Sequence, residues 1–462
     1  MKKGQPPSTD SRRDEILSGP ISKVLFKLSM PMIAGLISVI GFNVVDTFFI
    51  GKLGTQHLAA MGYIFPIVFI FSTIAIGMGV GTASILSRAI GGGQTTLVKK
   101  QASHSLYLSL TVVFASIVIG LLTIDPLFKL LGASGDTLQL IKDYMTIWYV
   151  GMFFLVVPMV GNSILRASGN TVFPGIIMTV SAVINIILDP ILIFGVLNFE
   201  GLGIEGAAYA TVIARALTMV TSLYVLHVKE RMLETSFPVW HEMLDSWKKL
   251  LAIGLPAAAT NVIAPATMAV ITKIVATYGE TALAAFTIIG RVEAFSFVIV
   301  IGLSSAIVPF VGQNYGANNL LRVRKGVNIA TMFCLLWGLT YAALAYRFSR
   351  EVPEIFSSQH EVISVAALFL VLVPISYATE AFRMVISSSL FALNKPIHSS
   401  LLSIFKSAVF GIPVVIYLSH SMGLQGVFIG LAFSNLASGA LSLVMFSATV
   451  KNLSIKSIKN PT

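Results

Sequence analysis

The second half of the chain repeats the first half at a distance of 225 residues, and no gap is needed to align them. The matched residues are Pro31 with Pro256, Gly54 with Gly279, Leu58–Ala60 with Leu283–Ala285, Gly77 with Gly302, Gly91 with Gly316, Lys100 with Lys325, Leu165 with Leu390 and Ala167 with Ala392. Two acids break the match. Asp46 stands opposite Ile271, and Asp189, aligned through Pro190 and Pro413, stands opposite Ile412. The repeat predicts two similar lobes, of which the first carries acids that the second lacks.

The composition indicates that lipid surrounds most of the chain. Hydrophobic residues make up 55% and charged residues 11%, and the mean hydropathy is +0.86. Because a helix needs about 20 apolar residues to cross a bilayer, we predict an all-α integral membrane protein with twelve transmembrane helices in two six-helix lobes. The spans are expected near residues 24–50, 58–82, 101–123, 141–164, 172–196, 205–228, 248–277, 281–310, 326–347, 361–388, 399–419 and 423–450.

Lys and Arg resist translocation, and they gather in alternate connections of this pattern. The outer loops hold only Lys52, Lys129, Lys142, Arg347 and Arg350. We therefore expect a cytoplasmic N-terminal tail (1–22), a first lobe (23–228), a cytoplasmic linker (229–247), a second lobe (248–450) and a cytoplasmic C-terminal tail (451–462). The net charge of +11 then reflects topology and contact with membrane lipid, and nucleic-acid binding is not expected.

Polar side chains recur at membrane depth in the first lobe. Asn43 and Asp46 share one helix face, as do Asn185 and Asp189, and Pro190 is expected to bend the fifth span beside Asp189. A carboxylate in hydrocarbon is unfavourable by several kcal/mol unless it is protonated, paired or hydrated. Arg215 is the nearest basic residue, and we do not expect it to lie deep enough to pair. Interhelical hydrogen bonding, protonation, a bound cation and a water-filled cavity stay open.

Further polar and aromatic residues of the first lobe are expected near these acids, namely Asn162, Thr211 and Tyr144. In the second lobe Glu380 and Arg383 are neighbours at i, i+3. Mutual neutralisation in the packing of spans 8 and 10 is the favoured interpretation. The alternative is a second cation or substrate site at Glu380.

An ordered set of motifs resembles the MATE family of multidrug and toxic compound extruders over residues 22–451. The motifs are Pro31 with N-V-V-D at 43–46, L-G-T-Q-H-L-A-A at 53–60, G-x-G-x-G-T-A-S at 77–84, G-N-S-I-L-R-A at 161–167, I-N-I-I-L-D-P at 184–190 and G-A-A-Y-A-T at 206–211. Span 1 with its Asp and span 5 with N-x-x-x-D look like the DinF-like branch. The resemblance implies two six-helix bundles around a central cleft, alternating access, and residence in the bacterial cytoplasmic membrane.

The same resemblance implies export of small organic cations and drugs in exchange for H⁺ or Na⁺, without a cofactor and by a monomer. Asp46, Asn185, Asp189 and Thr211 would couple the ion, and Asn43, Asn162 and Tyr144 would line the substrate cavity with the two acids. The Na⁺-coupled branch also uses an acid on span 7, but residues 255–270 hold none, which favours protons. A Na⁺ site built from the oxygens of the same four coupling residues stays the alternative.

Other classes fit the sequence less well. A lipid-linked-sugar flippase of the same superfamily would be expected to show extra spans and a more cationic cavity. An enzyme is not predicted, because neither H-E-x-x-H nor G-x-S-x-G occurs. An ATP-driven pump is excluded because the Gly51-Lys52 pair is followed by Leu53, so no P-loop can form there.

Overall fold

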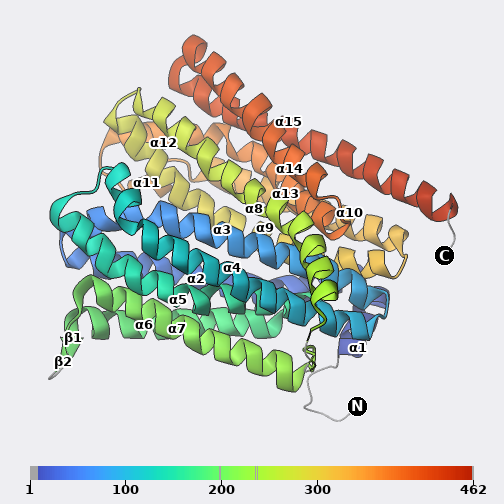
Figure 1. Cartoon of the computed structure of the whole chain (residues 1–462). Coiled ribbons are helices and arrows are strands. Elements are labelled where there is room, and N and C mark those ends of the chain that lie inside the picture. The colour runs from blue at the N-terminus through green and yellow to red at the C-terminus, as the bar shows by residue number, and fades with distance from the viewer. Residues whose placement is uncertain (1–8, 197–198, 235, 237, 460–462) are drawn as a thin grey trace. The chain divides into compact units, whose positions relative to one another are not determined.

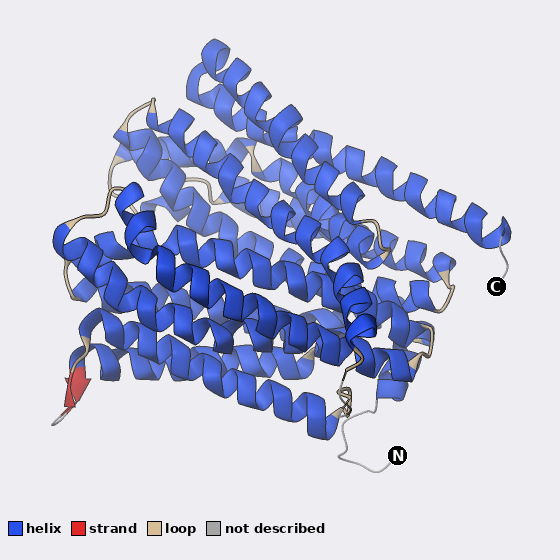
Figure 2. Cartoon of the chain, viewed as in Figure 1, coloured by secondary structure: helices blue, strands red, loops and turns tan. Residues whose placement is uncertain are grey.

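The computed structural model describes residues 9–196, 199–234, 236 and 238–459. These residues are almost entirely helical, with one hairpin of two-residue strands (Figure 2). The elements labelled in Figure 1 are α1 (Thr9–Ser18), α2 (Ile21–Lys52), α3 (Thr55–Gly91), α4 (Thr95–Leu130), α5 (Gly135–Ala167), α6 (Val172–Phe194), β1 (Gly195–Val196), β2 (Phe199–Glu200), α7 (Gly203–Tyr224), α8 (Trp240–Ala276), α9 (Glu280–Gly316), α10 (Leu320–Arg347), α11 (Glu351–Glu354), α12 (His360–Leu372), α13 (Tyr377–Ala392), α14 (Pro396–Ile404) and α15 (Ile412–Lys459). Two π-helices, η1 (Val225–Lys229) and η3 (Phe405–Gly411), and one 3-10 turn, η2 (Pro374–Ser376), complete them.

Among the described residues, eleven helical segments are long and apolar enough to cross a membrane. The last of them, Pro396–Ile455, has 60 residues, far more than one crossing needs. Gly423 interrupts it with φ 61° and ψ −142°, a conformation that only glycine adopts readily. The segment therefore supplies two crossings, and the predicted all-helical fold of twelve membrane helices is confirmed.

The described chain divides into two compact units. The first contains the residues up to Glu15 and Met30–Ala258, and the second contains Ile16–Ser29 and the residues from Ala259 onward. Helix α8 begins at Trp240, inside the segment predicted as a linker, and continues without a break to Ala276. The segment predicted as a linker is therefore partly helical and continuous with span 7.

In the first unit, helices α2 and α6 lie side by side. A Cβ at Gly175 would lie 2.3 Å from the Pro31 carbonyl oxygen, so glycine permits this close approach. Farther along, the Ser38 hydroxyl donates to the Thr179 hydroxyl at 3.2 Å. Helix α6 also packs against α7, and α5 packs against α3, α4 and α7. This packing places α2, α5, α6 and α7 around the acids discussed below.

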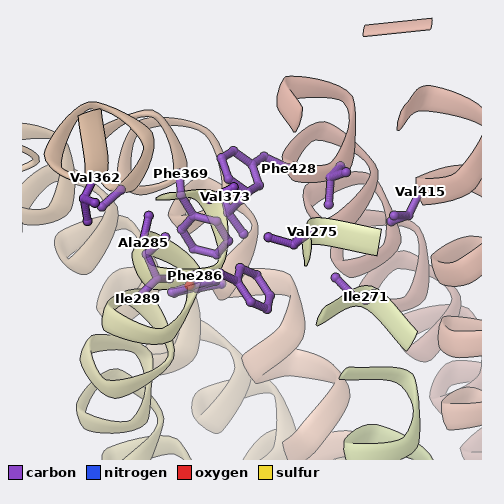
Figure 3. Packing of buried hydrophobic residues seen from close by; sticks show 14 residues of the cluster. Ile271, Val275, Ala285, Phe286, Ile289, Val362, Phe369, Val373, Val415 and Phe428 are labelled. Atoms are coloured by element: carbon purple, nitrogen blue, oxygen red, sulfur yellow. The ribbon is translucent and has the colours of Figure 1, made fainter. Parts of the chain in front are cut away.

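The second unit has an apolar core that α9, α12 and α15 share (Figure 3). Three rings form its centre. The Phe369 ring lies 6.3 Å from Phe286 and 5.0 Å from Phe428, both in edge-on contacts. Helix α13 packs beside this core against α9, α10 and α15, and it carries most of the polar groups of the unit.

Two spans of the second unit are irregular where the sequence predicted continuous helices. Span 10 breaks between α12 and α13 at the 3-10 turn that begins with Pro374. Span 11 passes through the π-helix η3 immediately before Pro413. Because proline crowds the carbonyl group four residues earlier, the wider π turn accommodates Pro413 and shifts the side chains of η3 relative to an ideal α-helix.

Candidate functional site

Asp46 on α2 and Asp189 on α6 are both buried in the first unit, with 8% and 0% of their surfaces exposed. They lie on α2 and α6, which are adjacent helices. Asp46 lies six residues before the end of α2 at Lys52, and Asp189 lies five residues before the end of α6 at Phe194. At about 1.5 Å per residue, each acid is less than about 10 Å from the end of its helix, so the pair lies near one end of the bundle and not at its middle.

Asn185 and Thr211 lie beside Asp189 as the sequence predicted. When the Asn185 amide is oriented to satisfy both neighbours, its nitrogen donates to Asp189 Oδ2 at 3.1 Å and its oxygen accepts from the Thr211 backbone N–H at 3.2 Å. A Cβ at Gly206 would lie 2.2 Å from the Leu192 carbonyl oxygen, so this glycine allows α7 to approach α6 closely there. The four predicted coupling residues therefore come from three adjacent helices.

The two acids are not neutralised by a basic side chain. Within the described residues no ion pair reaches Asp46 or Asp189, and the Oδ1 atom of each has no hydrogen-bond partner. Arg215 on α7 instead lies over the Phe42 ring, with its Cζ atom 6.0 Å from the ring centroid. Protonation, a cation or water can therefore satisfy these oxygens, whereas pairing with Arg215 does not occur in this structure.

The structure separates the residues predicted to line the substrate cavity. Tyr144 on α5 is buried and interacts electrostatically with both acids. Asn162 lies 18 residues farther along the same helix, which corresponds to about 27 Å, and it accepts from the Ser222 hydroxyl at 3.4 Å. Asn43 is exposed and donates to the Val39 carbonyl oxygen at 2.9 Å. Tyr144 therefore lies near the acid pair, whereas Asn162 is too distant to share a cavity with it.

Pro190 follows Asp189 directly, and α6 stays helical past it to Phe194. Because proline has no N–H, the Ile186 carbonyl loses its helical donor. We expect Pro190→Ala to restore this bond, move the Asp189 carboxyl and lower transport by more than it lowers expression. Pro126→Ala in α4, which changes another proline inside a helix of this unit, is the matched control. Transport per folded molecule is the measurement, and equal transport by both variants and the wild type would contradict the role assigned to Pro190.

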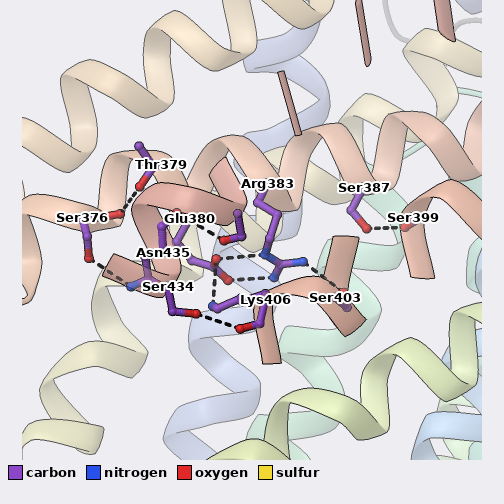
Figure 4. A network of polar contacts seen from close by, with 11 residues as sticks. Ser376, Thr379, Glu380, Arg383, Ser387, Ser399, Ser403, Lys406, Ser434 and Asn435 are labelled. Atoms are coloured by element: carbon purple, nitrogen blue, oxygen red, sulfur yellow. Dashed lines mark hydrogen bonds and ion pairs between the residues drawn. The ribbon is translucent and has the colours of Figure 1, made fainter. Parts of the chain in front are cut away.

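The second unit contains an ion-pair network centred on Glu380 (Figure 4). Arg383 donates to both Glu380 oxygens, from Nε at 2.9 Å and from Nη2 at 2.7 Å. Lys406 Nζ on η3 lies 2.8 Å from Glu380 Oε2. Mutual neutralisation was thus the right interpretation of Glu380 and Arg383, but the further partner is Lys406 of span 11. Arg291 of span 8 is exposed.

The Glu380 network lines one side of a cavity of about 240 Å³. The cavity is also lined by Glu293 of α9, Phe297 and Tyr377. Tyr377 donates a hydrogen bond to Glu293, and its ring lies 5.0 Å from that of Phe297. The sequence offered a site at Glu380 only as the alternative interpretation, and it did not place Phe297 or Tyr377 beside it.

The internal repeat contains a signal for the second-unit cavity. At the same distance of 225 residues, Glu293 stands opposite Val68 and Glu380 opposite Leu155. Lys406, aligned like Asp189 through the shared prolines, stands opposite Val183. Each lobe therefore has ionisable residues where the other is apolar. The repeat therefore marks Glu293, Glu380 and Lys406 in the second lobe as it marks Asp46 and Asp189 in the first.

Known proteins match this chain over nearly its whole length. The MatE family model matches residues 31–191 and again 256–417, which agrees with the internal repeat. A FAD transporter of Shewanella oneidensis is 37% identical over 92% of this chain and 94% of its own. The multidrug export protein MepA of Staphylococcus haemolyticus is 27% identical over 94% of this chain and 95% of its own.

Solved structures agree with the sequence relatives. The MATE transporter VcmN of Vibrio cholerae in its bent form has a TM-score of 0.89 and 31% identity, covering 94% of this chain and 97% of that one. With the family model matching twice and the twelve-helix fold in place, this chain belongs to the MatE family of multi-pass membrane transporters and is not an enzyme.

Proposed function

We propose that this protein is a secondary active exporter that carries small organic cations out of the cell in exchange for protons. The observation that carries the proposal is the buried pair Asp46 and Asp189, each with a carboxyl oxygen that has no partner among the described residues. A buried carboxyl without a counter-ion is well suited to exchange a proton for an organic cation, because each of them neutralises it.

The proposed switch uses both acids. When water reaches them from outside, Asp46 and Asp189 take up protons, α2 repacks against α6 and the cation leaves. When they face inside, they release protons and their negative charge binds the next cation. Alternating access between two lobes, residues 23–228 and 248–450, would expose the acids to each side in turn. The placement we propose is the bacterial inner membrane, with both termini cytoplasmic and a monomer as the working unit.

Sodium is the alternative coupling ion at the same place. The side-chain oxygens of Asp46, Asp189, Asn185 and Thr211 are hard donors of the kind that Na⁺ accepts. In the other amide orientation the Asn185 nitrogen donates to the Thr211 hydroxyl at 3.3 Å and the amide oxygen faces Asp189, so Asn185 can present an oxygen to Na⁺. The proton is proposed first because residues 255–270 of span 7 hold no acid.

A second candidate function is export of FAD. It is supported by the FAD transporter at 37% identity and by the two cations, Arg383 and Lys406, that line the second-unit cavity. The two functions differ in substrate charge, since FAD carries a pyrophosphate whereas the multidrug substrates proposed above are cations.

Reconstituted vesicles test both functions. In Na⁺-free buffer with an imposed pH gradient, we expect tetraphenylphosphonium or ethidium to be transported, and we expect transport to stop when a protonophore collapses the gradient. Transport that requires Na⁺ and ignores the protonophore would replace the proton by sodium. Transport of FAD in place of either cation would replace the first function by the second.

A further inference from the structure

We propose that the second-unit cavity is a binding site for an organic anion, in which Lys406 and Arg383 hold a phosphate or carboxylate group. The inference deepens the FAD candidate and rests on it for the identity of the transported compound. It does not involve Asp46 or Asp189, which belong to the first unit.

The ion pairs at the cavity leave its two cations with one shared partner. Glu380 is shared between two cations, because Arg383 occupies both of its oxygens and Lys406 shares Oε2. The other acid of the cavity, Glu293, accepts a hydrogen bond from Tyr377 and forms no ion pair within the described residues. By direct contact Arg383 and Lys406 therefore share one carboxylate, while Glu293 lines the cavity without contacting either of them. A bound anionic group would give Lys406 a direct partner that it does not share.

The Lys406 ammonium group has N–H bonds that are not directed at Glu380. Its ammonium group carries three N–H bonds, of which one is directed at Glu380. Its side chain is 27% exposed, compared with 11% for Arg383, so it is the more accessible of the two cations. Arg383 also donates from Nη1 to the Ser403 hydroxyl at 3.1 Å, which fixes the guanidinium beside the ammonium.

The backbone holds Lys406 in this position. Lys406 lies in the π-helix η3. Its carbonyl oxygen is outside the regular α-helical hydrogen-bond pattern and accepts a hydrogen bond from the Ser434 hydroxyl at 2.8 Å. A Cβ at Gly411 would lie 2.7 Å from the same carbonyl oxygen, so the turn needs a glycine there. Short π-helical turns frequently occur at functional sites because they redirect single side chains.

The size and walls of the cavity limit the ligand. A volume of about 240 Å³ is smaller than the range of about 300–1,000 Å³ that drug-sized ligands need. Phe297, Phe369 and Tyr377 form its aromatic wall. The site therefore fits one anionic group with one attached ring, or the anionic end of a larger molecule whose remainder lies outside.

The test uses the full-length protein purified in a neutral detergent and two pairs of probes that differ by a phosphate. We expect phenyl phosphate to bind about tenfold or more tightly than benzyl alcohol, and FMN more tightly than riboflavin, since hydrogen bonds to charged groups are of that strength. Lys406→Gln should abolish both preferences while leaving the Glu380–Arg383 pair closed. Lys273→Gln, which changes an exposed lysine outside the cavity, should retain them.

Calorimetric titration gives the decisive comparison. Equal affinity of the wild type for the charged and uncharged probes would overturn the proposal, as would a phosphate preference that survives in both Lys406→Gln and Arg383→Gln. Repeating the titration in nanodiscs with and without anionic lipid identifies the source of the phosphate, because a lipid headgroup in the site would compete with phenyl phosphate.

The FAD function and the anion site fail in different ways. If the wild type binds phenyl phosphate through Lys406 but does not export FAD, the site stands and the FAD function is wrong. If Lys406→Gln exports FAD as well as the wild type and also keeps its preference for phenyl phosphate over benzyl alcohol, the FAD function stands and this site is wrong.

Discussion

Asp46→Asn and Asp189→Asn are each expected to reduce gradient-driven export to background while the protein still folds and inserts. The amide has the shape of a protonated carboxyl and removes the unfavourable burial of a charge, but it cannot release a proton. The effects should not add in the double variant, because the two acids interact and act on one switch. Export per inserted molecule in vesicles is the measurement.

Asp125→Asn is the matched control for these variants. Asp125 is also an acid of the first unit, but its side chain is 48% exposed and it pairs with Lys142 at 2.7 Å. An exposed pair contributes only about 0–1 kcal/mol, so export should be unchanged. If this control also stops export, the loss in the other variants would reflect a general sensitivity to charge and not the role of the buried pair.

Substrate binding should depend on pH in a way that the same variants remove. Protonation of Asp46 and Asp189 neutralises the charge that attracts an organic cation, so affinity in Na⁺-free buffer should fall as the pH falls. In the double Asn variant the affinity should be constant with pH. A wild-type curve that is flat until Na⁺ is added would transfer coupling to sodium, and a pH response that survives in the double variant would move the site elsewhere.

The fold could be predicted well because the membrane restricts strongly how a backbone can satisfy its polar groups, and this restriction applies to every span. Twelve apolar runs have few ways to satisfy their backbone polar groups in lipid. Because the chain is duplicated, the spans predicted in one half can be compared with the spans predicted in the other. The break inside span 10 was harder to predict. The boundary between spans 11 and 12 was expected at residues 419–423, where Gly423 lies, whereas Pro374 divides span 10, and the hydropathy that marks a span does not distinguish a straight helix from a broken one.

Site residues on one helix face were easier to predict than site residues that different spans bring together. Asn185 and Asp189 are four residues apart on one helix, so the helical period alone predicts that they meet. Asn162 was expected beside the acids because it adds a polar group to a span of the same lobe, although 18 residues of α-helix separate it from Tyr144. The pairing of Lys406 with Glu380 joins different spans through a π-helix, and no periodicity along the chain contains that information.

Glu380→Gln is expected to destabilise the protein by about 3–5 kcal/mol, the usual effect of removing one partner from a buried ion pair. The side chains of Glu380 and Arg383 are only 9% and 11% exposed, and Lys406 uses the same carboxylate. A glutamine can accept a hydrogen bond but cannot neutralise either cation. The measurement is unfolding of the purified protein in mixed micelles with increasing amounts of a denaturing detergent.

Glu351→Gln is the control for Glu380→Gln. Glu351 pairs with Arg347 at 3.0 Å, but the two side chains are 53% and 71% exposed, so its loss should change stability by no more than about 1 kcal/mol. Phenyl phosphate adds a second readout, since an anion bound between Arg383 and Lys406 replaces the lost carboxylate. It should stabilise Glu380→Gln more than the wild type. A variant with normal stability that has lost coupling to the ion gradient would instead make Glu380 an ion-coupling residue, and the structural role assigned to it would be wrong.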